Sequence, residues 1–302
     1  MNFLFCDNPL NRNVVDDDYS EEFTVANELG HNVFLYNYEA LTVKRNPYLA
    51  TKRIPPSQLP CQLIYRGWIL KPTEYASLYE TLALKNYLLV NTPEEYQNCH
   101  YLPDSLKFIE AYTPKTIWLN CENGKIDFDE INSRLSVFDR SPIIVKDFVK
   151  SQKHYWNTAC FIPDAGDKDK VRLVVETFLD WQGDDLNEGL VFREYVELAD
   201  LTTHSKSGMP LKQEYRLFFY KQQLVCSCDY WEEGDYQHDD IPPTEIFTDI
   251  ANGVQSQFFT MDVAKTAIGG WIIIELGDAQ VAGLPLTTSR RDFYLKLEKY
   301  DT

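Results

Sequence analysis

Two apolar segments near the C-terminus, residues 258–263 and 271–276, constrain the fold more than any other part of the chain. Each has the β-branched and aromatic composition of a strand, and the residues between them include Gly269-Gly270. Glycines in that position are typical of a tight hairpin turn. The sequence therefore predicts a hairpin whose turn is centred between residues 268 and 269.

This register would place Asp262 directly opposite Glu275, on one face of the ribbon. Like charges in opposite positions destabilise paired strands, so the pair indicates a bound cation. Asp278 and Gln280 follow closely and offer further oxygen atoms, and such ligands suit Mg²⁺ held together with phosphates. A solvated, non-functional pair is the alternative. If no cation lies between the carboxylates, their repulsion predicts that Asp262→Asn leaves the ligand-free protein at least as stable.

Length and composition limit the function classes. The 302 residues suffice for about two domains. A net charge of −17 repels phosphate backbones, which argues against direct nucleic-acid binding. No uncharged apolar run reaches the length of a membrane span, and the N-terminus lacks the basic start and apolar core of a signal peptide. Seven cysteines are scattered without a CxxC pair, which favours reduced thiols and a cytoplasmic location.

The chain is expected to open strand–helix–strand, at 2–6, 20–29 and 33–36, as in an α/β layer. Further strands are expected at 62–65, 87–90, 116–119, 142–148, 189–197, 214–220 and 223–227. Further helices are expected at 74–84, 93–99, 104–111, 127–137, 171–181 and 243–258, with a last one from about residue 291. Residues 40–60 have the composition of a connection with little regular structure, and residues 163–170 have that of a mobile loop.

The segment 142–148 carries Lys146 in an apolar run, where a charged side chain costs desolvation free energy unless an anion meets it. Lys150 and Lys153 follow directly. Cationic side chains at the edge of a site are suitable ligands of a triphosphate, so we expect a phosphate site here. Lysines that extend their ammonium groups into solvent are the alternative.

Three other stretches carry weaker signals. The segment from Arg193 to Glu197 ends a strand that leaves one domain, so its backbone can meet an adenine edge and a carboxylate can reach the ribose. Arg216 shares a strand face with Glu214, and it either neutralises phosphate or forms a structural ion pair. Arg66 follows a buried strand, where open α/β sheets place ligand contacts. A surface arginine is the alternative for Arg66.

The motifs of Rossmann, P-loop, serine-hydrolase and zincin proteins are absent from the sequence. The chain has instead a lysine-bearing strand, a loop, a linker ending in Glu-Tyr-Val, a Glu-x-Arg strand, and an Asp and a Glu on paired strands. This order resembles an ATP-grasp enzyme. The segments VKDFVKSQKHYW, VFREYVEL, EYRLFF and ELGDAQVAGLP further resemble the bacterial and phage ATP-grasp clade named for one arginine and two lysines. The resemblance covers residues 140–297 well and the N-terminal part loosely.

The resemblance implies an ATP-grasp fold of mixed α/β and α+β class, in which two α+β subdomains clamp ATP. The implied division is 1–101 for an N-terminal pre-ATP-grasp α/β domain, 102–197 for the first subdomain and 198–302 for the second. It implies Mg²⁺ ligands at Asp262 and Glu275. Gly277 stands where the superfamily has Asn, and Asp278 is the expected substitute.

The same resemblance implies nucleotide contacts from one group of residues and catalytic, phosphate-neutralising contacts from two arginines. The arginine of the clade is carried onto Arg193, and its two lysines onto two of Lys146, Lys150 and Lys153. The further candidates for nucleotide contacts are Glu194, Tyr195, Val196 and Glu197, and Arg216 is the second candidate arginine. Members of the superfamily mostly activate a carboxylate as an acyl-phosphate with release of ADP, and an amine then displaces phosphate. The chain is thus expected to be an ATP- and Mg²⁺-dependent carboxylate–amine ligase, with a peptide or protein as one candidate acceptor and no nucleic-acid or membrane partner.

A non-catalytic ATP-binding protein is the alternative function. A eukaryotic assembly chaperone for a translation initiation factor has a similar ATP-grasp fold and binds a protein partner. The carboxylates Asp262, Glu275 and Asp278 are compatible with ATP–Mg²⁺ binding in either case. Arg66 is the sequence signal for an acyl-acceptor site, which only the ligase requires.

Overall fold

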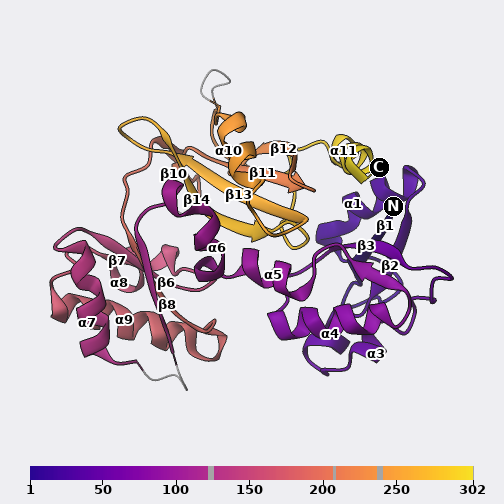
Figure 1. Cartoon of the computed structure of the whole chain (residues 1–302), viewed down its shortest axis with the longest axis horizontal. Coiled ribbons are helices and arrows are strands. Elements are labelled where there is room, and N and C mark those ends of the chain that lie inside the picture. Colours follow the sequence, from indigo (N-terminus) through magenta and orange to yellow (C-terminus); the bar gives the residue numbers. More distant parts are fainter. Residues whose placement is uncertain (122–125, 207–208, 237–240, 302) are drawn as a thin grey trace.

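The computed structural model describes residues 1–121, 126–206, 209–236 and 241–301. Within these ranges the strands form three four-stranded sheets and one two-stranded sheet. In chain order, the first of the three large sheets lies at one end of the molecule and the second at the other end, with the third between them (Figure 1). None of the described helices is both long and apolar enough to cross a bilayer.

The first sheet is parallel, in the order β2-β1-β3-β4. Its strands are β1 (Asn2–Cys6), β2 (Asn32–Tyr36), β3 (Cys61–Arg66) and β4 (Tyr87–Leu89). The helical segments between them are η1 (Asp17–Tyr19), α1 (Ser20–Glu28), α2 (Tyr38–Thr42), α3 (Pro47–Ala50) and α4 (Pro72–Ala83). Phe3, Leu4, Phe5 and Cys6 are all fully buried, so β1 is covered on both faces, as its continuous apolar run requires.

The second sheet is antiparallel, in the order β5-β8-β6-β7. Its strands are β5 (Thr116–Asn120), β6 (Ile143–Asp147), β7 (Phe161–Ile162) and β8 (Gly189–Glu194). The helices α7 (Phe128–Leu135) and α9 (Lys168–Gln182) share one hydrophobic core with it. The short segments η4 (Lys153–Tyr155) and α8 (Trp156–Ala159) connect β6 to β7.

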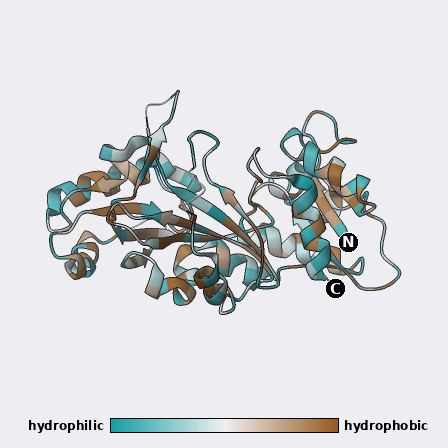
Figure 2. Ribbon diagram, turned by 90° about the horizontal axis from the view of Figure 1, so that it is seen from above, coloured by the Kyte–Doolittle hydropathy of each residue, from teal (hydrophilic) through white to brown (hydrophobic). Residues whose placement is uncertain are grey.

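The third sheet is antiparallel, in the order β12-β11-β13-β14. Its strands are β11 (Glu214–Tyr220), β12 (Gln223–Asp229), β13 (Phe258–Lys265) and β14 (Trp271–Asp278), and α10 (Thr244–Ala251) packs on it. The helix α5 (Pro93–His100) lies between the first sheet and the others, and α6 (Leu102–Ile109) packs on the third sheet beside β14 (Figure 1). Figure 2 shows hydrophobic residues along the strands of the sheets.

The predicted elements are largely confirmed, but the strand expected at 189–197 ends at Glu194, and three further corrections apply. Residues 40–60 contain parts of the short helices α2 and α3, which Asn37 and Asn46 cap by accepting backbone N–H groups. The segment 163–170 is regular from Lys168 onward because Asp167 caps α9. The helix expected at 243–258 ends at Ala251. The two-stranded sheet of β9 (Asp200–Thr203) and β10 (Pro210–Lys212) was not predicted, because its strands are short and polar.

The C-terminal helix α11 (Arg290–Asp301) returns to the first sheet, so the two ends of the chain lie together (Figures 1 and 2). The ring of Tyr294 lies edge-on to Phe3 at 4.9 Å between centroids, and its hydroxyl donates to Glu22 at 2.9 Å. Residues from both ends of the sequence thus share one hydrophobic core. The boundaries 1–101, 102–197 and 198–302 stay predictions.

Arg66 is fully buried, so the expected role as an open contact for an anionic substrate is wrong. Its Nε and Nη2 atoms each donate to the Glu22 carboxylate at 2.8 Å, and Nη1 donates to the carbonyl oxygen of Ala279. Glu22 lies on α1 and Ala279 follows β14, so this side chain joins the first sheet to the segment after the third. Burial of the guanidinium is tolerated because the carboxylate pairs with it in a bidentate geometry.

Replacement of Arg66 therefore should destabilise the whole chain. We expect Arg66→Met to lower the free energy of unfolding by about 3–5 kcal/mol, because Glu22 keeps a buried charge without its partner. The control is Arg134→Met, since Arg134 forms an exposed pair with Glu130 one helical turn away and should cost about 0.5 kcal/mol or less. Urea unfolding measures both. Similar small losses for the two variants would contradict the structural role of Arg66.

Candidate functional site

The hairpin of β13 and β14 has the predicted pairing at its carboxylates, since Asp262 lies opposite Glu275. The predicted turn centre is wrong, because Lys265 pairs with Trp271 and the turn is centred on residue 268. A β-bulge between the turn and Asp262 shifts the register of the two strands by one residue, and this shift restores the predicted pairing at the carboxylates. Val263 pairs with Ile273 while Asp262 pairs with Glu275, which leaves Ile274 as the extra residue of β14.

Each carboxylate of the pair has a cationic partner. Arg216 on β11 lies opposite Asp262 and donates to it from Nε and Nη2, both at 2.7 Å. Lys146 on β6 extends from the second sheet, and its Nζ atom lies 2.9 Å from Oε2 of Glu275. We call these four side chains, Arg216, Asp262, Glu275 and Lys146, the charge row. It crosses the third sheet and ends on the second.

The cations of the charge row overturn one expectation. The carboxylates do not face each other unneutralised, so Asp262→Asn should not stabilise the ligand-free protein. The change would instead leave the Arg216 guanidinium without the carboxylate that accepts two of its hydrogen bonds. Arg216 is held by Asp262 and not, as the sequence suggested, by Glu214.

The two carboxylates differ in burial and in charge stabilisation. Asp262 is 3% exposed, and burial raises the pKa of its carboxyl above the usual value although Arg216 opposes this effect. The side chain of Glu275 is 34% exposed. Its burial alone would raise its pKa, but the charge and hydrogen bond of Lys146, with Arg193 and Arg216 nearby, hold the pKa below its usual value. Glu275 is therefore an ionised carboxylate that a ligand can reach.

Arg193 lies on the same sheet as Lys146 and connects that sheet to the bulge. Its guanidinium donates to the carbonyl oxygens of Ile273, at 3.1 Å, and of Ile274, and also to Oγ1 of Thr113. Burial lowers the pKa of Arg193 to about 10, while the charge of Glu275 opposes the change. The Nε atom of Arg193 is buried without a hydrogen-bond partner within the described residues. Arg193 is thus beside the charge row but engaged with the backbone of β14.

The other two lysines behave differently. The ammonium group of Lys153 lies 5.0 Å from the ring centre of Trp231 and 6.0 Å from that of Tyr230. The same Tyr230 ring lies 4.9 Å from Cζ of Arg216, so Lys153 approaches the charge row from the segment after β6. Lys150 is exposed, and its backbone N–H donates to Asp147. The structure brings Lys153 towards the site through these rings, which the sequence analysis did not single out.

Asp147 is a second residue that the sequence analysis missed. Its carboxylate is fully buried and accepts hydrogen bonds from the backbone of Val149 at 2.7 Å and of Lys150. Side-chain amides of Gln182 and Asn187 donate to its other oxygen, each at 2.8 Å. The sequence did carry a signal for Asp147, because a carboxylate within an apolar strand is unusual. These contacts fix the start of the segment that carries Lys150 and Lys153.

Glu214 lies near the opposite end of the charge row. Burial raises the pKa of its carboxyl to about 7, against the charge of Lys153, and the negative charge of Asp262 adds to the increase. Its backbone carbonyl accepts from Tyr230 N–H at 3.2 Å and from the Tyr236 hydroxyl at 3.0 Å. Glu214 therefore holds the segment after β12, which carries the two rings near Lys153.

The linker comprises Glu194, the last residue of β8 in the second sheet, and Tyr195, Val196 and Glu197, which lead to β9 of the two-stranded sheet. The backbone N–H groups of Glu194 and Tyr195 donate to carbonyl oxygens of Lys115 and Pro142, both at 2.9 Å, and the carbonyl of Glu197 accepts from Ala267 at 2.9 Å. The Tyr195 ring lies edge-on to Phe161 at 5.2 Å. Val196 is half-buried and Glu197 is exposed. The linker is thus hydrogen-bonded to segments that adjoin strands of the second and third sheets.

Asp278 lies away from the charge row. Side chains alternate between the faces of a strand, so Asp278 and Glu275, three positions apart, point to opposite faces of β14. Its carboxylate accepts from Asn91 Nδ2 at 2.6 Å and from Gln280 N at 2.9 Å, and burial raises its pKa to about 7. The structure brings Asp278 into the contact with the N-terminal part of the chain and not into the pair of Asp262 and Glu275.

Within the described residues, no group of three or more His, Cys, Asp or Glu side chains is arranged to hold a metal ion. The charge row offers two facing carboxylates, Asp262 and Glu275. Mg²⁺ is commonly held by one or two carboxylates together with substrate phosphates. The donor set therefore fits Mg²⁺ that arrives with a nucleotide and does not fit a metal ion held by protein ligands alone.

Comparisons with known proteins agree with this arrangement. The family model for an ATP-grasp domain, family 3 of the clade named for one arginine and two lysines, matches residues 134–297, more than half of the chain. No curated protein matches the sequence. Among solved structures, D-cycloserine synthetase DcsG is similar with a TM-score of 0.63 and 13% identity, over 100% of each chain.

Two other similar structures support the same fold. The RimK domain ATP-grasp protein from Sphaerobacter thermophilus has a TM-score of 0.59 and 11% identity, over 99% of this chain and 98% of that chain. The ATP-grasp ligase PsnB, in complex with a phosphomimetic variant of its minimal precursor, Mg and ADP, has a TM-score of 0.58 and 13% identity, over 100% of this chain and 99% of that chain. The predicted ATP-grasp fold is confirmed.

The pair of Arg216 and Asp262 can be tested without a ligand. We expect Asp262→Asn to lower the free energy of unfolding by about 3 kcal/mol, because it leaves a largely buried guanidinium unpaired. The double variant Asp262→Asn with Arg216→Met should recover most of this loss, since it removes both charges. Denaturant unfolding of the two single variants and the double variant gives the coupling free energy. A double variant whose loss equals the sum of the single losses would contradict a coupled pair.

Proposed function

Because this chain belongs to the ATP-grasp superfamily, in family 3 of the clade named for one arginine and two lysines, we propose that it is an ATP- and Mg²⁺-dependent ligase that joins a carboxylate to an amine. The observation that carries the proposal is the charge row at the junction of two sheets. Arg216 and Lys146 each neutralise a carboxylate that a metal ion could take over, at distances of 2.7 and 2.9 Å. When a metal ion binds the carboxylates, the side chains of Arg216 and Lys146 are released and become available to phosphate oxygens.

In this proposal the nucleotide lies between the second and third sheets. Lys146, Lys153 and Arg216 neutralise the phosphates, and the linker of Glu194, Tyr195, Val196 and Glu197 lies beside the adenine and ribose. Support comes from the place of the linker, which hydrogen-bonds to segments that adjoin both sheets. Lys150 remains a candidate for a phosphate contact because its exposed side chain is unconstrained by the backbone contact to Asp147. Arg193 fixes the position of β14 through its hydrogen bonds to the backbone. Catalysis depends on Arg193 because β14 carries Glu275.

Asp262 and Glu275 would hold Mg²⁺ together with phosphate oxygens, and Asp278 would keep its structural contacts. Bound Mg²⁺ supplies charge stabilisation to the phosphoryl group that is transferred. Arg216 and Lys146 can then donate to the phosphate oxygens in a site with little water, where such contacts are strongest. Glu275 is the more exposed of the two carboxylates, so we assign it the first contact with the incoming ion.

The proposed reaction has two steps. A carboxylate oxygen of the first substrate attacks the γ-phosphorus of ATP, a P–O bond to ADP breaks, and an acyl-phosphate forms. The amine nitrogen of the second substrate then attacks the acyl carbon, the C–O bond to phosphate breaks, and a C–N bond forms with loss of a proton from nitrogen. The cationic side chains stabilise charge on the transferred phosphoryl group in both steps.

A hollow of about 520 Å³ offers a place for the acceptor amine, and Glu22, the buried partner of Arg66, is one of its lining residues. It lies between the segments that follow β1 and β3 and residues 281–290, which follow β14. Asp17 and Asp18 line one side, and Trp68 and Ile69, both partly exposed, line another. Carboxylates beside an aromatic ring favour a cationic ligand, and a protonated amine is such a ligand.

The acceptor class is proposed as an amine that a peptide or protein can carry. PsnB is a ligase solved in complex with its precursor peptide PsnA2, and similarity to it at 12–13% identity supports only the fold. The size of the hollow and its partly exposed apolar side chains support a ligand larger than ammonia. A cytoplasmic location, as expected from the sequence, is part of the proposal and is supported by the seven free thiols.

Lys146 should determine ATP affinity. We expect Lys146→Ala to weaken ATP–Mg²⁺ binding at least tenfold, about 1.4 kcal/mol, because a buried cation that can meet phosphate is removed. Titration calorimetry measures the affinity, and Lys44→Ala, at an exposed position of the N-terminal part, is the control. Unchanged affinity in a folded Lys146→Ala protein would remove Lys146 from the nucleotide site.

The reaction type is tested by turnover. We expect labelled ATP, incubated with the protein and pools of metabolites or peptides, to yield ADP and phosphate when the correct acid and amine are present. Release of AMP would contradict an acyl-phosphate route. Tight ATP binding without turnover in any pool would favour the alternative, a non-catalytic ATP-binding protein with a protein partner.

Asp18 tests the acceptor site in the hollow. Once an active pair of substrates is found, Asp18→Asn should raise the KM for a cationic acceptor with little effect on ATP affinity.

A further inference from the structure

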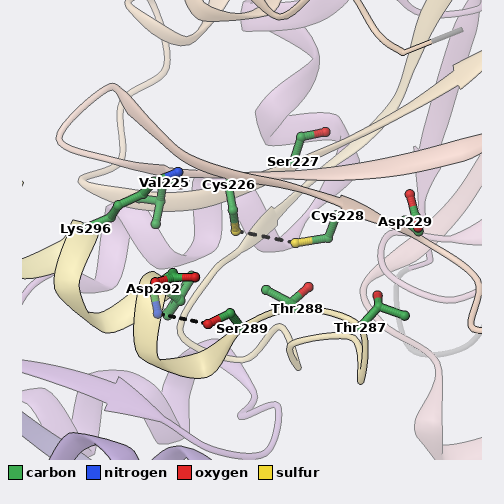
Figure 3. A pocket seen from close by; sticks show the side chains of 11 residues that line it. Val225, Cys226, Ser227, Cys228, Asp229, Thr287, Thr288, Ser289, Asp292 and Lys296 are labelled. Atoms are coloured by element: carbon green, nitrogen blue, oxygen red, sulfur yellow. Dashed lines mark hydrogen bonds between the residues drawn. The ribbon is translucent and has the colours of Figure 1, made fainter. Parts of the chain in front are cut away.

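We propose that Cys226 and Cys228 form a two-thiol site for a soft, thiophilic metal ion. Both residues lie on β12, the edge strand of the third sheet, and point to one face of it. Their sulfur atoms are 3.4 Å apart (Figure 3). The inference goes beyond the proposed ligase, because the reaction described above uses neither thiol.

The two sulfurs are accessible from a hollow of about 280 Å³ between β12 and the start of α11. Cys226 is half-buried and Cys228 is 4% exposed, so an ion would enter past Cys226. The opposite wall carries Thr288, Ser289 and Asp292 (Figure 3). The remaining five cysteines, Cys6, Cys61, Cys99, Cys121 and Cys160, are also free, but no contact between two of their sulfurs is recorded in the described residues.

The spacing of the sulfurs fits chelation. With a metal–sulfur distance of about 2.3 Å, two sulfurs on a tetrahedral ion lie about 3.8 Å apart. The observed 3.4 Å is close to that value, so small rotations of the side chains would be enough. Since no group of three potential ligands exists among the described His, Cys, Asp and Glu residues, the protein supplies two sulfurs, and water or a small thiol completes the shell.

The hydrogen bond between the two sulfurs and the nearby cations favour one thiolate in the pair, at Cys228. The thiol of Cys226 shares a hydrogen bond with Cys228, and this contact lowers the pKa of Cys228 while it raises that of Cys226. Lys296 lines the hollow and donates to the carbonyl oxygen of Val225 at 2.7 Å. Arg216 pairs with Cys228 across the strands. Both cations favour a thiolate, which is the form that binds metal.

The chemistry of the pair separates it from the Mg²⁺ site of the charge row. Thiolates select soft ions such as Cu(I), Zn²⁺ and Cd²⁺, whereas Mg²⁺ prefers oxygen ligands. The thiol pair lies next to Arg216 on the same face of the third sheet, so an ion there would add positive charge beside the charge row. Because Mg²⁺ prefers oxygen ligands, excess Mg²⁺ should leave the two-thiol site empty.

Cadmium is the probe for the test. The fully reduced protein is titrated with Cd²⁺ in the presence of excess Mg²⁺, and the ultraviolet sulfur-to-cadmium charge-transfer band reports binding. We expect one Cd²⁺ per chain, with an affinity that falls at least tenfold in Cys226→Ser and in Cys228→Ser. Cys61→Ser, which changes another half-buried thiol, is the matched control and should bind normally. Unchanged affinity in either single variant of the pair, or no band in the native protein, overturns the proposal.

A second measurement on the native protein covers variants that fail to fold. Phenylarsine oxide reacts with two neighbouring thiols to form two As–S bonds and release one water. We expect one arsenical per chain, and peptide mapping after alkylation should show that Cys226 and Cys228 alone are protected. Protection of another pair of cysteines, or of none, overturns the proposal. ATP affinity, measured separately, is unaffected by this outcome, so the ligase proposal is tested independently.

Discussion

The structure depends on the neutralisation of two carboxylates, one buried and one half-buried, by cationic side chains. Two carboxylates, Asp262 and Glu275, face each other across two strands, an arrangement that costs free energy unless cations meet it. The fold provides one cation from each side, Arg216 from the neighbouring strand and Lys146 from another sheet. The second and third sheets are thus joined by an ion pair whose members also suit a nucleotide and its metal ion. A ligand that displaces these ion pairs would therefore change the contact between the second and third sheets.

A second set of buried polar contacts joins the first sheet to the third. Arg66 binds Glu22 and the backbone of Ala279, while Asn91 binds Asp278. These contacts leave no role for Arg66 in substrate binding, and they hold Asp278 away from the charge row. These contacts between the first and third sheets therefore fix the end of β14, and so the position of Glu275. Substitutions that break them should affect the nucleotide site because they move this strand.

Much of the site could be predicted from the sequence where local rules decide. The facing of Asp262 and Glu275 followed from strand alternation and a glycine turn, and it held although the turn centre was wrong, because a bulge at Ile274 compensated. The partners of the carboxylates could not be predicted. Arg216 is 46 residues from Asp262, and Lys146 is 129 residues from Glu275, so only tertiary packing brings them together. Strand alternation, applied to β14, would have placed Asp278 on the other face.

The proposed metal–nucleotide site depends most on Glu275, the half-buried carboxylate that Lys146 holds in an ionised state. Thermal unfolding of the native protein and of Glu275→Gln, each with and without ATP–Mg²⁺, tests it most directly. Ligand binding stabilises a folded protein by RT ln(1 + [L]/Kd), so the native protein should show a nucleotide-dependent increase in Tm that Glu275→Gln largely loses. Glu130→Gln, at an exposed helical position, should keep the full increase. If Glu275→Gln also keeps the full increase, the charge row is not the site of the metal–nucleotide complex.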